Sequence, residues 1–192
     1  MSDDIIAWVD ESGSNTALDP YIMAAALTSP AQAEAPRSFR TTLRLPHQAK
    51  IHWRDEQAAQ HCQIPTALAA ADVEHLVVIT TPHNPRHSSE RRRRLTLELL
   101  LPELAALGVT QAILESRGKA DDRRDLATLN YLRQQRTLDA TLKVDHRIGR
   151  QEPALWAPDA LCGIISSLHS GNPSYYQTIQ RKITVLQQPP RA

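Results

Sequence analysis

Acidic side chains end several apolar segments that lie far apart in the sequence. These acids are Asp10 and Glu11 after the apolar run 5–9, Glu115 after the run 112–114, and Asp159 directly after Pro158. An ionised carboxylate is costly to leave in an apolar interior, so each of them must meet water, a cation or a hydrogen-bond donor. Because hard divalent cations bind carboxylate oxygens, a divalent-metal site is the first hypothesis for Asp10.

A set of such acids could catalyse the hydrolysis of a phosphodiester bond. The reaction requires an activated water and neutralisation of charge on the attacking and leaving oxygens, which two metal ions about 4 Å apart can provide. The expected cofactor is Mg²⁺ or Mn²⁺, and its predicted ligands are Asp10, Glu115 and Asp159. Three carboxylates that bind the same metal ions must lie close together. Without a cation their negative charges would raise one another's pKa, so metal binding and ionisation should be coupled.

The elements that must position these acids can be read from the hydrophobic pattern. Five segments are typical of strands: 5–9, 21–28, 76–80, 109–114 and 142–147. A continuous apolar run favours a strand covered on both faces, so the first strand is expected near the middle of the sheet. The short connection to 21–28 predicts an antiparallel hairpin. Three consecutive alanines in 21–28 leave a short helix as the competing interpretation.

Helical periodicity appears in the remaining segments. The expected helices are 90–107, 121–139, one that begins near Asp159 and a C-terminal helix over 174–186, with a helical insert around 30–72. Strands joined by helices return parallel through right-handed crossovers. The predicted architecture is therefore α/β, with a mixed five-stranded sheet of three antiparallel strands and then helix-linked parallel strands, flanked by helices. This is the element order of the ribonuclease H-like fold, and 192 residues suit one such domain over 1–192.

The charge balance limits how this chain could bind nucleic acid. Its formal net charge is +1, so any affinity for nucleic acid must come from a local basic face. The residues predicted to contact nucleic acid are Lys50, Arg91, Arg92 and Arg94. Consecutive arginines on a helix cannot share one face, so only about two of the run 91–94 could meet the same ligand. One Phe, four Tyr and three Trp provide few platforms for stacking unpaired bases.

Cysteine spacing and hydropathy exclude other classes of protein. Cys62 and Cys162 show no CxxC spacing, so neither a disulfide framework nor a zinc ribbon is indicated. No apolar run approaches the roughly 20 residues of a membrane helix, and the acidic N-terminus lacks the basic region of a signal peptide. We therefore expect a cytoplasmic protein that does not bind membranes.

Four motifs, in this order, resemble a bacterial family known as domain of unknown function 3800. They are Val9-Asp10-Glu11-Ser12-Gly13, Lys50-Ile51-His52, Ile113-Leu114-Glu115 and Ala157-Pro158-Asp159-Ala160-Leu161-Cys162-Gly163. The resemblance implies a ribonuclease H-like fold with an acidic metal site. It equates Asp10 with the first-strand acid, Glu115 with the acid closing the fourth strand and Asp159 with the acid on the last helix. The chain departs from the family at Lys50, where an acid is common, and at Pro158.

Each acid also has a plain structural interpretation. Asp10 could cap the turn that follows it, and Glu11 could be exposed or support the site from behind. Glu115 could be a surface acid paired with Arg117. Asp159 could be an ordinary first-turn acid that interacts with the positive end of its helix.

Two functions fit these residues. The first is a divalent-metal-dependent nuclease acting on RNA or DNA, with Asp10, Glu11, His52, Glu115 and Asp159 in its catalytic group. The second is a catalytically inactive ribonuclease H-like module that binds nucleic acid or a protein partner, and hydrolysis of a small phosphoester is a third possibility. His52 could orient substrate or accept a proton, or it could be a histidine packed beside Trp53. Asp145 and His146 are expected to be solvated.

Overall fold

A mixed sheet forms the centre of the molecule. The computed structural model describes residues 4–12, 19–32, 50–81 and 86–188. The strands are β1 (Ile5–Ser12), β2 (Tyr21–Thr28), β3 (Glu74–Thr80), β4 (Val109–Glu115), β5 (Lys143–Arg147) and β6 (Ile183–Gln188). They form a six-stranded sheet in the order β5-β4-β1-β2-β3-β6. The first three strands pair antiparallel, whereas β4, β5 and β6 pair parallel with their neighbours.

This topology confirms the expected mixed sheet and the central place of the first strand. Residues 21–28 form a strand and not the competing helix, because the buried alanines 24–26 pair with β1 on one side and with β3 on the other, and this pairing overrides their low strand propensity. The expected helix over 121–139 ends at Gln134, shortly before Arg136 takes a left-handed φ of 58°.

The C-terminal segment differs from its prediction. The expected helix over 174–186 is a short helix, α7 (Ser174–Ile179), followed by a 3-10 turn, η4 (Gln180–Lys182), and then β6. Alternate side chains of β6 pack on opposite faces of the sheet, with Val185 against one core and Leu186 against the other. Pairing with β3 over residues 75–80 therefore adds a sixth strand to the five that were predicted.

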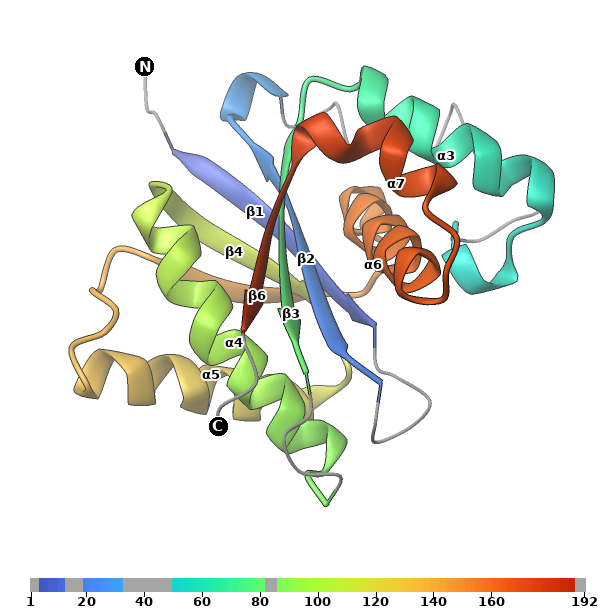
Figure 1. Cartoon of the computed structure of the whole chain (residues 1–192). Coiled ribbons are helices and arrows are strands. Elements are labelled where there is room, and N and C mark those ends of the chain that lie inside the picture. Colours follow the sequence, from blue (N-terminus) through green and yellow to red (C-terminus); the bar gives the residue numbers. More distant parts are fainter. Residues whose placement is uncertain (1–3, 13–18, 33–49, 82–85, 189–192) are drawn as a thin grey trace.

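Helices cover both faces of the sheet (Figure 1). One face packs against α3 (Ala58–Ala70), α6 (Trp156–His169) and α7, and the other against α4 (Ser89–Ala106) and α5 (Lys119–Gln134). Each face has its own apolar core, as expected when a sheet is buried on both sides. Among the described residues, no helix is both long and apolar enough to cross a membrane.

The region expected as a helical insert is described only in part. It contains η1 (Pro30–Gln32), η2 (Trp53–Asp55) and α3, while 33–49 lies outside the described residues. The turn at Gly13 also lies outside them. A further 3-10 turn, η3 (Pro153–Leu155), leads directly into α6.

Candidate functional site

The alternation of side chains along β1 and β4 determines which acids can meet. Trp8 of β1 and Ile113 of β4 belong to the core on the α6 side, so Asp10 and Glu115, two residues further along each strand, face the same side. Asp159 lies in the first turn of α6, which packs over β1 and β2. All three carboxylates line one cavity of about 590 Å³.

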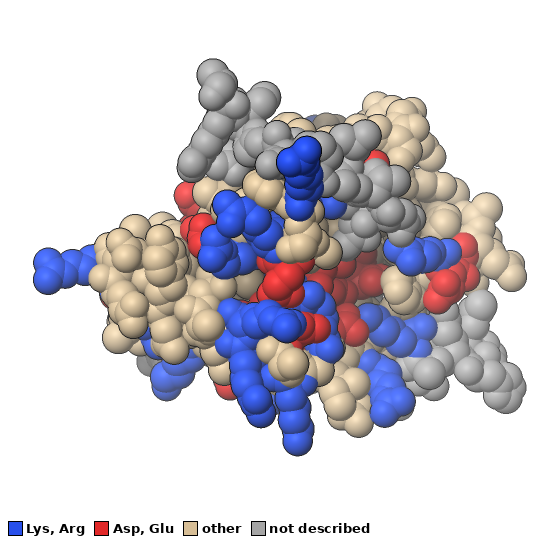
Figure 2. All heavy atoms as spheres, turned by 90° about the horizontal axis from the view of Figure 1, so that it is seen from below, with Lys and Arg blue, Asp and Glu red and all other residues tan. Residues whose placement is uncertain are grey.

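This cavity opens on a face where charged side chains gather. Figure 2 shows acidic side chains in the middle of that face, with lysine and arginine side chains around them. Lys50 and His52 also line this cavity. The structure therefore brings these two predicted residues together with the three carboxylates, on the α6 side of the sheet. Glu11 borders the same cavity from the edge of β1.

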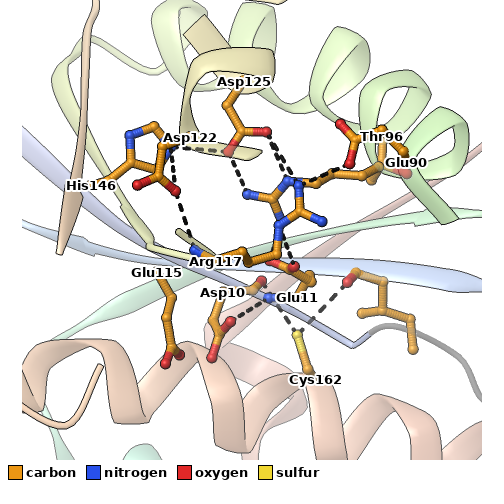
Figure 3. Close-up of polar contacts among 12 residues, drawn as sticks. Asp10, Glu11, Glu90, Thr96, Glu115, Arg117, Asp122, Asp125, His146 and Cys162 are labelled. Carbon is orange, nitrogen blue, oxygen red and sulfur yellow. Dashed lines mark hydrogen bonds and ion pairs between the residues drawn. The ribbon is translucent and has the colours of Figure 1, made fainter. Parts of the chain in front are cut away.

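Asp10 is held in place from its own strand and from α6. Its Oδ1 accepts a hydrogen bond of 2.8 Å from the backbone N–H of Glu11, and the Cys162 thiol lies 3.5 Å from its backbone oxygen (Figure 3). Burial, followed by the charge of Glu115 and a hydrogen bond with it, raises the pKa of Asp10 well above its usual value. Burial and the neighbouring Glu115 thus disfavour the ionised form of Asp10.

Lys50 places its ammonium group among the acids. Its Nζ lies 2.9 and 2.6 Å from the two carboxylate oxygens of Glu115 and 3.9 Å from Oδ2 of Asp10. Burial disfavours the charged lysine, but the surrounding carboxylates outweigh burial and raise the pKa of Lys50. Burial likewise opposes ionisation of Glu115, yet hydrogen bonds from Asp10 and Lys50 lower its pKa. Glu115 is thus a carboxylate paired with Lys50 and not with Arg117.

Asp159 is oriented by the segment that also carries Lys50. The backbone N–H of Trp53 donates a 2.8 Å hydrogen bond to Oδ2 of Asp159, and Nδ1 of His52 lies 3.4 Å from Oδ1. Burial raises the pKa of Asp159, although the charges of His52 and Lys50 oppose that rise. His52 is 46% exposed, so it is not packed against the neighbouring ring. Trp53 stacks instead on His61, with ring centroids 4.3 Å apart.

Two glycines make room for this arrangement. A Cβ atom on Gly149 would lie closer than 3.0 Å to both carboxylate oxygens of Glu115. A Cβ on Gly163 would lie equally close to the indole ring of Trp53. Both positions therefore need glycine for close packing and not for an unusual φ angle.

The three carboxylates of the cavity are suitable ligands for a divalent cation, although in this structure a lysine compensates their negative charge. Among the described residues, no group of three or more His, Cys, Asp or Glu side chains is arranged to hold a metal ion. The positive charge of Lys50, which pairs with Glu115 and lies 3.9 Å from Oδ2 of Asp10, compensates the carboxylates instead. Three carboxylates from three different elements at one cavity are nevertheless the oxygen-rich donors that Mg²⁺ and Mn²⁺ prefer. A cation could join Asp10, Glu115 and Asp159 only if Lys50 moved away.

Glu11 faces the other side of the sheet, where it joins a buried network of charged residues. It forms ion pairs with Arg93 and, at 3.5 Å, with Arg117. Arg93 also donates two hydrogen bonds to Asp125, at 2.8 and 2.7 Å. Figure 3 shows this network on the side of the strands opposite to Asp10 and Glu115. The carboxylate of Glu11 thus lies on the opposite face of the sheet from that of Asp10, and it forms ion pairs with two arginines.

His146 belongs to the same network, contrary to the expectation that it is solvated. Its Nε2 lies 3.0 Å from Asp125, and its side chain is only 9% exposed. Asp145 is half-buried and accepts a hydrogen bond of 2.7 Å from Gln111. Polar side chains are expected on an edge strand such as β5, but these two are held by neighbouring residues.

The arginines of the run 91–94 have different environments. Arg91 and Arg94 are exposed, whereas Arg92 and Arg93 are 6% and 1% exposed. Arg92 donates to the backbone oxygen of Asp19 and lies over the Tyr21 ring at 5.5 Å. The prediction that Arg92 contacts nucleic acid is therefore corrected, because its guanidinium is directed into the protein.

Sequence reasoning missed Arg93, Asp125 and Arg117 as structural supports of the site. One signal was present: Arg93 lies on the same helical stripe as the buried leucines Leu97, Leu100 and Leu104 of α4. An arginine on an apolar stripe is expected to be buried, and arginine is almost never fully buried without a partner. The sequence alone does not show which residue that partner is.

The comparisons with known proteins identify the fold. No protein-family model matches the chain, and no curated protein matches it. Among solved structures, the chain is similar to ribonuclease H2 from Pyrococcus horikoshii OT3, with a TM-score of 0.59, 15% identity, and coverage of 90% of this chain and 76% of that one. The RNase HII of an Archaeoglobus fulgidus complex with PCNA gives a TM-score of 0.57 at 11% identity, covering 86% and 73%.

A third similar structure is Bst-RNase HIII in complex with Mn²⁺. Its TM-score is 0.53 at 15% identity, and the alignment covers 88% of this chain and 56% of that one. Identities this low establish a shared fold and not a shared activity. Because no family model matches, the resemblance to domain of unknown function 3800 has no support from that comparison. The chain has a ribonuclease H-like fold, with the sheet order and flanking helices described above.

Proposed function

We propose that this protein is a divalent-metal-dependent nuclease that hydrolyses phosphodiester bonds in RNA or DNA. The observation that carries the proposal is the position of Asp10, Glu115 and Asp159, which come from β1, β4 and α6 and line one cavity. The similarity to structures named as ribonucleases, one of them with Mn²⁺, supports the same conclusion.

The three carboxylates would hold Mg²⁺ or Mn²⁺. The bound ions would activate a water molecule and neutralise charge on the attacking and leaving oxygens. Asp10 would have to be ionised on binding, against the effect of burial and Glu115 on its pKa, because a metal ligand must be deprotonated. Lys50 would have to leave the oxygens of Glu115 that it now contacts.

Other residues of the cavity have roles that need no metal. The displaced Lys50 ammonium carries a positive charge at the cavity, where it attracts a phosphate group. His52 combines an exposed imidazole with contact to Asp159, so it is placed to transfer a proton or to orient substrate. Glu11 supports Asp10 through its backbone N–H and does not contact substrate in this proposal.

The test is cleavage of labelled RNA, DNA and RNA–DNA hybrid with Mg²⁺ or Mn²⁺, for the natural protein and for Asp10→Asn and Asp159→Asn. Asp139→Asn is the matched control, because Asp139 is exposed and precedes β5, at the opposite end of the parallel strands from Glu115. We expect cleavage that EDTA stops, that both site variants lose and that the control retains. Cleavage by Asp10→Asn equal to that of the control would refute the assignment.

One observation favours a second candidate, an inactive module that binds nucleic acid or a protein. The Lys50–Glu115 ion pair neutralises the acids without a metal ion. Titration calorimetry with Mn²⁺ separates the two functions. A nuclease should bind Mn²⁺ and lose that binding in Asp159→Asn, whereas a module with an internally neutralised site should bind no Mn²⁺ in either form.

A further inference from the structure

A second cavity lies between α4 and α5. Its volume is about 430 Å³, and arginines from both helices line it: Arg91 and Arg94 from α4 and Arg124 from α5. Tyr131, which is 49% exposed, forms part of its wall. The cavity therefore presents three guanidinium groups beside one exposed ring.

The positive charge of this cavity is only weakly compensated. Arg94 pairs with Glu98 at 3.3 Å, and Arg124 pairs with Asp121 one turn earlier on its helix. Such exposed pairs contribute little free energy, so an anion can replace them. Within the described ranges, no ion pair is found for Arg91. Among the described residues of the wall, the one acid is Glu90, which is paired with Arg117 at 3.2 Å.

A short chain of contacts joins this cavity to the acidic one. Glu90 belongs to the wall of the arginine cavity, Arg117 contacts both Glu90 and Glu11, and Glu11 borders the acidic cavity. Three linked side chains, Glu90, Arg117 and Glu11, therefore connect the walls of the two cavities at the ends of α4 and β1. Duplex DNA carries one charge per about 1.7 Å of its axis, so a duplex at the acidic cavity would present further phosphates nearby.

We propose that Arg91, Arg94 and Arg124 bind backbone phosphates that flank the scissile bond, so that the substrate is a nucleic-acid polymer and not a small phosphoester. This inference rests on the proposed function. Arginine suits the role because its planar guanidinium donates two parallel hydrogen bonds to phosphate. The contacts are to the backbone alone, so they set affinity and register without reading sequence.

The test compares two triple variants that lose the same charge. The first replaces Arg91, Arg94 and Arg124 with glutamine, and the control replaces three exposed arginines outside both cavities, Arg123, Arg136 and Arg181. Fluorescence anisotropy measures binding of duplex RNA, duplex DNA, hybrid and single strands at several salt concentrations in EDTA. Circular dichroism checks that both variants are folded.

We expect the cavity variant to bind duplexes at least about tenfold more weakly at low salt and to show a salt slope smaller by about 2 to 3, one unit per lost phosphate contact. The control variant should change far less. Equal losses in the two variants, or no binding of any nucleic acid by the natural protein, would overturn the inference.

A second readout distinguishes failure of this inference from failure of the proposed function. With Mn²⁺, hydrolysis of bis(p-nitrophenyl) phosphate should be the same in the cavity variant and the natural protein, while KM for the polymer rises. If the small ester is hydrolysed but the two triple variants bind the polymer equally well, the proposed role of the arginine cavity is refuted and the nuclease function is not. Weakened polymer binding by the cavity variant, with no hydrolysis of either substrate, would refute the nuclease and support the arginine cavity.

Discussion

Asp10 and Glu11 are consecutive residues of β1, yet their carboxylates lie on opposite faces of the sheet. Asp10 faces α6 together with Glu115, and Glu11 pairs with Arg93 on the side of α4 and α5. The backbone N–H of Glu11 donates to Asp10, so the buried ion pairs on one face orient a carboxylate on the other. The two acids should consequently respond to substitution in different ways.

Asp10→Asn should abolish metal binding with little effect on stability. Burial and Glu115 raise the pKa of Asp10 and so disfavour its charge, which means that a neutral amide of the same shape costs little there when no metal is bound. We expect Mn²⁺ affinity to fall by more than about 100-fold, beyond the usual loss for residues that only support a metal ligand. The free energy of unfolding should change by less than about 1 kcal/mol. Calorimetry and urea unfolding measure the two effects, and a large loss of stability with unchanged affinity would contradict the prediction.

Lys50→Met should strengthen Mn²⁺ binding. In the structure, the ammonium of Lys50 contacts the oxygens that a cation would need. Its removal leaves acids that only a cation or additional protons can compensate. The variant should be less stable than the natural protein in EDTA, and Mn²⁺ should restore its melting temperature. Weaker Mn²⁺ binding in the variant would instead identify Lys50 as an aid to the site and not a competitor.

Arg93→Ala should destabilise the protein strongly. It leaves the carboxylates of Asp125 and Glu11 buried without their main partner, and breaking such a pair costs about 3–5 kcal/mol. Arg94→Ala is the matched control, because Arg94 is exposed and its pair with Glu98 should contribute less than about 1 kcal/mol. Urea unfolding of the two variants tests the contrast, and similar losses for both would count against a structural role for the network.

Gly149→Ala should impair the site and leave most of the stability intact. The new Cβ would displace the Glu115 carboxylate, which is the far end of a flexible side chain and can move without disturbing the core. The displaced carboxylate loses its contact with Lys50 and its place beside Asp10. We expect Mn²⁺ affinity and cleavage to fall by about tenfold or more, as for other residues that orient a metal ligand. A crystal structure of the variant with Glu115 unmoved would rule out this explanation.

His75 should make the protein sensitive to mild acid. Both ring nitrogens are buried and, in the described part of the chain, have no hydrogen-bond partner. Burial, with a smaller effect of Lys182, lowers the pKa of His75 to about 3 from its usual value of 6.5. Below pH 6.5 the unfolded chain therefore binds a proton that the folded protein excludes, and the free energy of unfolding falls as pH falls.

The expected loss is about 2 kcal/mol between pH 6.5 and pH 5, since each pH unit corresponds to about 1.4 kcal/mol. This contribution is fully present above pH 6.5, so no change from His75 is expected at higher pH. Urea unfolding at a series of pH values measures it. His75→Leu should remove this part of the pH dependence, and an unchanged profile in the variant would show that other groups cause it.

The parts of the fold that follow from local pattern could be predicted from the sequence. The apolar run before Asp10 indicated a central strand, and Asp10 and Glu115, which end two strands that pair in parallel, were both predicted as metal ligands. The strand at 183–188 could not be predicted in this way, because its conformation depends on pairing with β3, about a hundred residues earlier. Long-range pairing of this kind overrides local propensity.

The same distinction applies to the site. Carboxylates at strand ends were recognised from the sequence because their position next to apolar runs is itself unusual. The position of Lys50 between Asp10 and Glu115 could not be predicted from the sequence. The residues around Lys50 show no helical or strand periodicity that would indicate where its side chain points. The burial of Arg92 and Arg93 likewise depends on Asp19 and Asp125, which the fold brings near.

The packing of Trp53 on Gly163 connects α6 mechanically to a distant segment. The indole ring lies where a side chain at position 163 would be, and the amide of the same tryptophan binds Asp159. His52 directly precedes that tryptophan, and Lys50 lies three positions before it. A methyl group at position 163 would collide with the indole ring, so the ring or the helix would have to shift. Because the same tryptophan binds Asp159, such a shift would reach the acidic cavity while every ionisable group of the cavity is retained.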